Sequence, residues 1–319
     1  MIEVGYHLSS EEHRPEALVR NASEAEEAGF KFLSVSDHFH PWVDRQGQSP
    51  FVWGVIGGIS QATESLPLFT AVTCPMIRTH PAIIAQAAAT SACLMPGRFM
   101  LGVGTGENLN EHILGDPWPP IDVRLEMLEE AIDVIRLLWS GEEESHRGRF
   151  YTVDHARIYS TPEAPPPILV AAKGSKATAL AGSKGDGLVG TSPDSDQMKE
   201  FEEAGGSGKP RYGMFHVCWG EDEASARKTA LEWWPNSSIK GELGVELPLP
   251  RHFEQAAEMI DEDDVAKDVI CGPDPGPYLK SIKEFEEAGY DHVFIHQVGP
   301  DQQGFIDFCR KEILPAVAG

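Results

Sequence analysis

The chain repeats one pattern eight times: a short apolar run that ends in polar residues and is followed by an amphipathic stretch. The runs are continuously apolar, which is typical of strands covered on both faces of a parallel sheet. Eight such units predict an α/β fold of the (β/α)8 TIM-barrel type. The eight runs are residues 4–6, 32–35, 68–72, 99–103, 168–171, 187–190, 212–218 and 292–296.

The amphipathic stretches between the runs indicate helices over residues 15–29, 81–94, 124–139 and 277–289. The first and last of these close with Gly29 and Gly289, the residue type expected just past a helix end. A doubly wound open sheet would also alternate strands with helices and is the alternative fold. No Gly-x-Gly-x-x-Gly pattern opens the first strand-to-helix turn, which favours the barrel.

Two segments do not fit the repeat. Residues 145–161 alternate like a β-hairpin inserted after the fourth unit. Residues 235–264 are proline-rich, charged and long enough to form a lid over the barrel mouth. Because no linker is evident, we expect one barrel domain over residues 1–319 that carries these two insertions.

The charge of the chain limits its partners. Fifty acidic residues against 26 basic ones give a net charge of −24, which opposes binding to nucleic acids and anionic membranes. Such a surface also fits a halophilic protein, because counterions in a salty cytoplasm screen the repulsion. There is no apolar run long enough for a membrane helix and no signal-peptide pattern. Five scattered cysteines without a Cys-x-x-Cys pair indicate a reduced, cytoplasmic protein.

Polar residues follow most of the predicted strands, and the carboxyl ends of barrel strands meet at one rim. The second strand is followed directly by Asp37, His38 and Trp42. Histidine is the natural proton acceptor near neutral pH, and the carboxylate of Asp37 could orient a partner or a cofactor. The other rim groups are His7, Glu11, Thr73, Glu107, Asn110, Lys173, Ser175, Thr191, Ser192, His296 and Gln297.

Two turns could hold a flat, phosphorylated ligand. Gly104, Thr105 and Gly106 form a glycine-rich turn that lets the backbone approach a ring closely. Residues 171–176 lead into a helix whose first N–H groups are open to a phosphate. Each turn also has a purely structural interpretation, as a tight strand-to-helix turn or as a helix N-cap at Ser175.

The pair His38 and His40 also has the His-x-His spacing of metal-dependent hydrolase barrels. Such sites need further His and Asp ligands on later strands. His296 is available, but Gln297 stands where the final acid is needed. We therefore expect no metal.

Three segments together carry a resemblance to a known family. They are Ser-Asp-His-Phe-His-Pro-Trp at 36–42, Thr-Cys-Pro-Met-Ile-Arg-Thr-His-Pro at 73–81 and Leu-Gly-Val-Gly-Thr-Gly-Glu-Asn-Leu-Asn-Glu at 101–111. These resemble the luciferase-like flavin and deazaflavin oxidoreductases, and among them the coenzyme F420-dependent glucose-6-phosphate and secondary alcohol dehydrogenases. The likeness runs from Gly5 to about Pro315. It implies a luciferase-like barrel, a homodimer, and F420 bound at the carboxyl-terminal rim.

The resemblance also implies roles for single residues. His38 looks like the base that removes the substrate hydroxyl proton as hydride passes to C5 of the deazaflavin, and Glu107 resembles the acid that protonates the reduced ring at N1. Trp42 and Glu11 look like pocket residues that position substrate and intermediate. The dipeptide Ala71-Val72 matches a non-prolyl cis peptide behind the ring. We expect cofactor contacts at Asp37, Ala71, Val72, Gly104, Thr105, Gly106, Asn110, Ala172, Lys173, Gly174 and Thr191.

The sequence departs from the sugar-phosphate members at their phosphate-binding lysines. Pro193 and Asp194 stand where one lysine is expected, and Gln255 aligns with another. Because an acid repels a phosphate dianion, the substrate is expected to be an alcohol or a sugar other than glucose 6-phosphate. The alternatives are an FMN-dependent monooxygenase on the same barrel, a metal-dependent hydrolase using His38 and His40, and a non-catalytic cofactor-binding protein.

Overall fold

The computed structural model describes residues 1–318 and contains a closed barrel of parallel strands. Each strand pairs with the next in the order β1-β2-β3-β4-β7-β8-β9-β11, and β11 pairs with β1 to complete the ring. The predicted TIM barrel is confirmed, and the open sheet is wrong. The barrel strands are β1 (Glu3–Leu8), β2 (Leu33–Val35), β3 (Leu68–Thr70), β4 (Phe99–Val103), β7 (Ile168–Ala171), β8 (Gly187–Gly190), β9 (Arg211–Cys218) and β11 (His292–Gln297).

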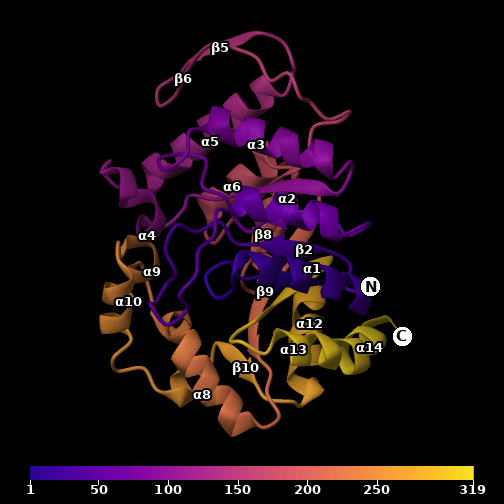
Figure 1. Ribbon diagram of the computed structural model, residues 1–319. Coiled ribbons are helices and arrows are strands. Elements are labelled where there is room, and N and C mark those ends of the chain that lie inside the picture. Colours follow the sequence, from indigo (N-terminus) through magenta and orange to yellow (C-terminus); the bar gives the residue numbers. More distant parts are fainter. Residues whose placement is uncertain (319) are drawn as a thin grey trace.

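Helices surround this ring (Figure 1). The two helix ends predicted from glycine are confirmed, because Gly29 and Gly289 have φ values of 99° and 103°, a region that favours glycine. The chain ends lie near each other on one side of the molecule (Figure 1). The outer helices are α1 (Pro15–Ala28), α2 (Val52–Ala62), α3 (Pro81–Leu94), α5 (Ile121–Leu138), α6 (Ser175–Lys184), α7 (Ser195–Phe201), α8 (Glu223–Trp233), α12 (Pro275–Ala288), α13 (Gln302–Phe308) and α14 (Leu314–Ala318).

The barrel interior changes character along its axis. The part away from the carboxyl ends of the strands is filled by four aromatic side chains. Their contacting ring centroids lie 5.1–6.4 Å apart, and they are Phe32, Phe69, Tyr212 and Phe294. Aromatic pairs at this spacing stabilise a core beyond the area they bury. This packed floor closes the lower end of the barrel, so a ligand can enter only from the rim.

Nearer the carboxyl ends of the strands, histidines replace the aromatic rings on one side. His7 on β1, His216 on β9 and His296 on β11 form this layer, with ring centroids of 5.1 Å between His296 and each of the other two. On the other side of the barrel, Ala71 follows β3, Gly104 follows β4, and Ala171 ends β7. The mouth is therefore polar on one side and has little side-chain volume on the other.

Both predicted insertions take defined forms. The hairpin consists of β5 (Glu144–Arg147) and β6 (Thr152–Ala156) and projects beyond α3 and α5 at the top of Figure 1. Residues 235–265 form the short helices η3 (Pro235–Ser238), α9 (Leu243–Glu246), α10 (Pro250–Ala256) and α11 (Glu262–Val265). A short strand that the sequence did not predict, β10 (Val269–Cys271), then pairs with the end of β9.

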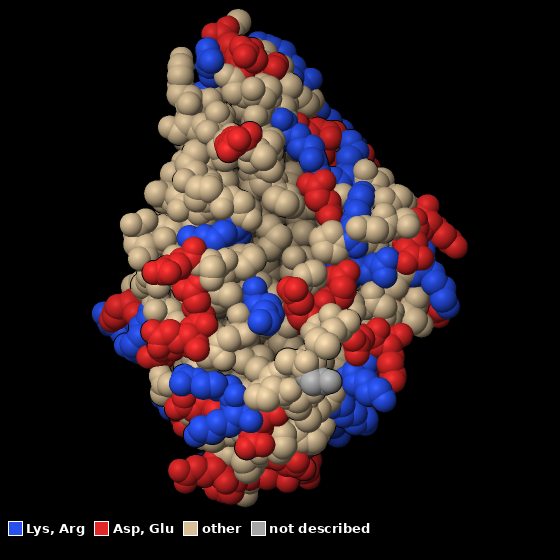
Figure 2. Space-filling view, turned by 90° about the vertical axis from the view of Figure 1, so that its right-hand side faces the viewer, with Lys and Arg blue, Asp and Glu red and all other residues tan. Residues whose placement is uncertain are grey.

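Charges of both signs are interspersed on the face shown in Figure 2, where acidic side chains lie close to basic ones. Most of the ion pairs are exposed, such as Lys176 with Asp122 and Lys199 with Asp196. Exposed pairs of this kind stabilise a fold by at most about 1 kcal/mol each. Among residues 1–318, no helix combines the length and apolarity needed to cross a bilayer.

Candidate active site

A histidine–carboxylate pair occupies the rim between the first two strands. Nε2 of His38 lies 3.2 Å from Oε1 of Glu11, and both side chains are largely buried. Glu11 follows β1, and His38 follows β2, so the pairing of these neighbouring strands brings the two groups together. The other oxygen of Glu11 accepts hydrogen bonds from Ser36 at 2.5 Å and Ser9 at 3.1 Å.

These contacts determine the charge of the pair. Burial raises the pKa of Glu11, but the adjacent His38 and the Ser36 hydroxyl outweigh it, so the net pKa lies below its ordinary value. The other ring nitrogen of His38, Nδ1, lies 3.2 Å from the carbonyl oxygen of His40. Both ring nitrogens of His38 thus lie near acceptors, which hold the ring in a fixed orientation.

The loop after β2 is held in place from two directions. Oδ1 of Asn110 accepts hydrogen bonds from the backbone N–H groups of Phe39 at 2.9 Å and His40 at 3.2 Å. Trp42 lies against the His38 ring at 5.0 Å and against Phe253 of α10 at 5.2 Å. The insertion over residues 235–265 therefore packs directly on the loop that carries His38.

Asp37 points away from the His38–Glu11 pair into a buried ion pair. Its carboxylate accepts hydrogen bonds from Arg78 at 2.9 Å and from Thr73 at 2.8 Å. The same guanidinium contacts Glu111 at 3.4 Å, and the backbone N–H of Arg78 donates to Glu111 at 2.8 Å. Arg78 was not singled out from the sequence, although it lies in one of the quoted segments. Its position beneath the rim makes it a support for the site.

The half of the rim with small side chains has the form of a cradle for a flat ligand. The peptide bond between Ala71 and Val72 is cis, as the resemblance implied. A Cβ on Gly104 would lie 2.7 Å from Cγ2 of Val72, and one on Gly106, whose φ is 68°, would lie 2.6 Å from the Cys74 sulfur. Side chains at these glycines would fill the space beside the cis peptide. The glycine turn therefore leaves a flat surface here.

An open helix N-terminus lies at the neighbouring strand end. Gly174 is the N-cap of α6 and no side chain caps the helix, so its first N–H groups are available to an anion. Lys173 and Thr191 are exposed beside it, whereas Ala172 is buried and donates its N–H to Val189. The N-cap expected at Ser175 is instead one residue earlier.

Glu107 lies at the end of β4, just before the short helix α4 (Asn108–Glu111). It is half-buried, and its one side-chain hydrogen bond comes from Nδ2 of Asn110 at 3.4 Å. A carboxylate with so weak a contact remains available to a ligand over the glycine turn. Thr105 lies beside it in the same turn and is also half-buried.

The structure does not bring His38 and His40 together as a ligand pair. Nδ1 of His40 lies 2.9 Å from the carbonyl oxygen of Leu109, and its ring stacks on His112 at 5.7 Å. Within residues 1–318, no group of three or more His, Cys, Asp or Glu side chains has the arrangement of a metal site. His40 thus fixes the loop that carries His38.

Asp194 and Gln255 stand at the positions where the resemblance led us to expect phosphate-binding lysines. Oδ1 of Asp194 accepts hydrogen bonds from the N–H groups of Asp196 and Gln197 at 2.9 and 3.1 Å, so Asp194 is the N-cap of α7. Gln255 is exposed on α10. Neither side chain supplies a positive charge.

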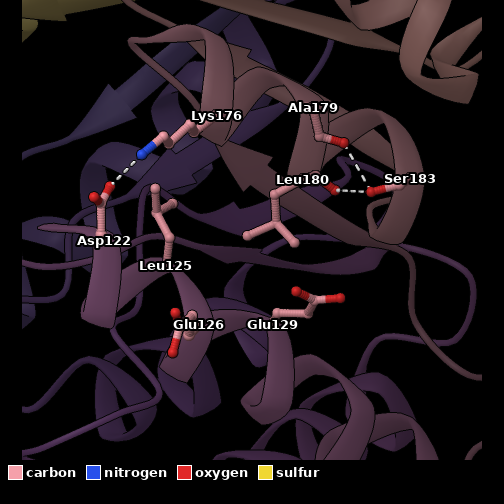
Figure 3. A pocket seen from close by; sticks show the side chains of 8 residues that line it. All are labelled: Asp122, Leu125, Glu126, Glu129, Lys176, Ala179, Leu180 and Ser183. Atoms are coloured by element: carbon pink, nitrogen blue, oxygen red, sulfur yellow. Dashed lines mark hydrogen bonds and ion pairs between the residues drawn. The ribbon is translucent and has the colours of Figure 1, made fainter.

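A separate groove of about 430 Å³ lies between α5 and α6 (Figure 3). An ion pair between Lys176 and Asp122 at 2.7 Å spans one end of it. Its walls come from the outer helices α5 and α6, and it contains none of the candidate catalytic residues His38, Glu11 and Glu107. It is lined by Asp122, Leu125, Glu126, Glu129, Lys176, Ala179, Leu180 and Ser183.

Comparison with known proteins identifies the family. The model of the luciferase-like monooxygenase family matches residues 1–292. The chain belongs to this family. Among its luciferase-like relatives, the F420-dependent hydroxymycolic acid dehydrogenase of Mycobacterium tuberculosis is 38% identical over 98% of this chain and 87% of its own length. The F420-dependent glucose-6-phosphate dehydrogenase of Intrasporangium calvum is 34% identical over the full length of both chains.

A solved structure agrees with this assignment. An F420-dependent secondary alcohol dehydrogenase, determined with an F420-acetone adduct, superposes with a TM-score of 0.91 at 30% identity and covers 99% of both chains. A type II Baeyer-Villiger monooxygenase with FMN from Pseudomonas putida has a TM-score of 0.72 at 15% identity and shares the fold alone. The luciferase-like family therefore includes this chain, and the relatives named here at 30% identity or more are F420-dependent dehydrogenases.

Proposed function

We propose that this protein is an F420-dependent dehydrogenase that transfers hydride between an alcohol or sugar and C5 of the deazaflavin. The observation that carries the proposal is the buried His38–Glu11 pair next to the flat cradle of Ala71, Val72 and Gly104. The full-length relatedness to F420-dependent dehydrogenases supports it.

The residues of the rim fit this cofactor. The cradle leaves a surface on which a planar ring can lie, and the uncapped N-terminus of α6 beside Lys173 suits a phosphate. Thr105 and Gly106 would contact the ring from the β4 turn, and Thr191 would contact the polar part of the cofactor. When bound, F420 supplies a hydride acceptor at C5.

His38 handles the substrate proton in this proposal. In the neutral form it donates from Nδ1 to the His40 carbonyl, which leaves Nε2 as the acceptor for a hydroxyl proton. Once Nε2 holds that proton, the carboxylate of Glu11 at 3.2 Å pairs with the imidazolium. Trp42 packs against the His38 ring and excludes water from this side. In the reverse direction, the same pair returns the proton to a carbonyl oxygen.

Glu107 holds the second proton. Its half-buried carboxyl group lies at the end of β4 beside the glycine turn, on the cradle side of the rim. A proton held at this carboxyl group would compensate negative charge at N1 of a bound deazaflavin. Asn110 links Glu107 to the loop that carries His38, since its amide contacts the Glu107 carboxylate and the backbone N–H of Phe39.

The same site predicts a preference against phosphorylated sugars. Asp194 caps α7 and Gln255 is neutral, so neither position offers a cation to a phosphate dianion. We expect glucose 6-phosphate to have a kcat/KM at least about tenfold below that of neutral alcohols or free sugars, equivalent to about 1.4 kcal/mol. Steady-state reduction of F420 with each substrate measures this. Efficient and saturable oxidation of glucose 6-phosphate would contradict it.

We also propose a homodimer, and the uncharged surface of α2 and α3 supports it. Neither helix contains Asp, Glu, Lys or Arg, in a chain with a net charge of −24, and Ile83 on α3 is 58% exposed. We expect sedimentation equilibrium to give twice 34.9 kDa for the protein and about half of that value for Ile83→Glu, because the interface would bury an unpaired charge. Met259→Glu, on an exposed loop, is the control and should stay dimeric. A monomeric parent protein would contradict the proposal.

We infer a cytoplasmic, salt-adapted protein from the acidic surface. Acidic and basic groups alternate on the face in Figure 2, but acids exceed bases by 24 over the chain. Screening should relieve this repulsion, so the melting temperature is expected to rise as KCl increases into the molar range. Differential scanning calorimetry with KCl measures it, and a melting temperature that is unchanged or lower in molar salt would contradict the inference.

A further inference from the structure

The mechanism above does not use the histidine layer at the barrel mouth. In this layer, Nε2 of His296 lies 2.7 Å from Oε2 of Glu12, and Nδ1 of His296 lies 2.8 Å from Nδ1 of His216. The other oxygen of Glu12 accepts a hydrogen bond from the N–H of Gly299 at 2.8 Å. The side chains of Glu12 and His296 are 0% and 1% exposed. Three polar side chains thus form one chain of hydrogen bonds, in which Glu12 and His296 are buried.

The order of this chain fixes the tautomers when both imidazoles are neutral. The carboxylate of Glu12 can only accept, so Nε2 of His296 carries hydrogen and its Nδ1 is an acceptor. Nδ1 of His216 must then donate to His296, which leaves Nε2 of His216 as an acceptor. Burial and the neighbouring His296 lower the pKa of His216 to about 3, which agrees with a neutral ring.

His216 is the member of this chain that reaches the ligand space. It faces the barrel interior, because Tyr212 and Met214 on the same face of β9 belong to the interior core. In contrast to Glu12 and His296, it is only half-buried, and Nε2 makes no hydrogen bond within residues 1–318. Trp234 flanks the ring at 5.6 Å. When both imidazoles are neutral, an acceptor oriented by two buried groups thus lies at the barrel mouth.

The catalytic pair lies next to this acceptor. Glu11 and Glu12 are adjacent residues, and one pairs with His38 while the other pairs with His296. The two histidine–carboxylate pairs therefore occupy neighbouring parts of the same rim. A substrate that places its reacting hydroxyl at His38 would extend over the histidine layer with its remaining atoms.

We propose that His216 binds a second hydroxyl group of the substrate through Nε2, so that the preferred substrates are diols or unphosphorylated sugars. This inference rests on the proposed dehydrogenase function. Glu12 and His296 are positioning residues in it, because they act on the substrate through the tautomer of His216.

Alcohols that share the same four-carbon skeleton test the inference. With saturating F420, the protein should oxidise the better of 2,3-butanediol and 1,3-butanediol with a kcat/KM about tenfold above that of 2-butanol, as one hydrogen bond would give. His216→Phe should abolish this preference, so that kcat/KM for the diol falls to within about twofold of kcat/KM for 2-butanol. His216→Gln keeps an acceptor and should retain part of the preference.

Glu12→Gln provides a readout that a merely structural role would not move. It should raise KM for the diol by a larger factor than KM for 2-butanol. Fluorescence quenching of F420 checks that each variant is folded and loaded. Equal kcat/KM for diols and 2-butanol in the parent protein would overturn the role of His216 and leave the dehydrogenase proposal standing. Oxidation of none of these alcohols would contradict the dehydrogenase proposal as well.

Discussion

Replacement of His38 by alanine is expected to lower turnover by about 10²–10⁴-fold, the usual contribution of a general base, while F420 affinity stays within a few-fold. The reason is positional. His38 presents Nε2 to the rim, has Glu11 at 3.2 Å to stabilise the imidazolium, and is oriented by the His40 carbonyl. In the variant, the hydroxyl proton would have no acceptor when hydride leaves the carbinol carbon.

His40→Ala is the matched control for this prediction, since it removes a second imidazole from the same loop. His40 contacts the Leu109 carbonyl and His112, so its loss should loosen the loop and lower turnover by about tenfold or less. Stopped-flow reduction of F420 measures turnover, and fluorescence quenching measures affinity. Equal losses in the two variants would contradict a specific role for His38. A loss of F420 affinity in His38→Ala would make His38 a binding residue instead.

The barrel could be predicted from the sequence because its strands are continuously apolar and each ends at a polar or glycine signal. The predicted strands over 99–103, 168–171 and 187–190 match the observed bounds. β10 was missed because three residues, Val269–Cys271, carry too little pattern to separate a strand from a loop. The insertion over residues 235–264 could be recognised from its composition, but its helices could not be predicted, since each of them is seven residues or shorter.

His38 could be singled out because it lies in a segment with a specific resemblance, but the residues that support the candidate site could not. Arg78 contacts Asp37 and Glu111, which lie 41 and 33 residues away in the sequence. Only the folded chain shows that these carboxylates share one buried cation, and removal of such a partner costs about 3–5 kcal/mol in general. Polar groups that act through distant partners leave no local pattern.

Two expected ligand contacts also have structural roles that the sequence did not indicate. The amide oxygen of Asn110 is taken by the N–H groups of Phe39 and His40, and the carboxylate of Asp37 by Arg78 and Thr73. Both residues organise the rim from below. Their contact with the cofactor stays a prediction. In the histidine layer, His7 and His296 were expected at the rim, but His216 was missed, because the sequence does not show that it contacts His296.

Cofactor affinity tests the central claim most directly. The cradle at Ala71, Val72 and Gly104 and the anion site at the N-terminus of α6 would serve a flavin as well as a deazaflavin in shape, so the choice between them separates a dehydrogenase from a monooxygenase. Titration of the purified protein with F420 and with FMN, followed by fluorescence quenching, gives both dissociation constants. We predict a Kd for F420 at least about 10²-fold lower than for FMN, equivalent to about 2.7 kcal/mol. Equal or tighter binding of FMN would contradict the account and assign the protein to the monooxygenases.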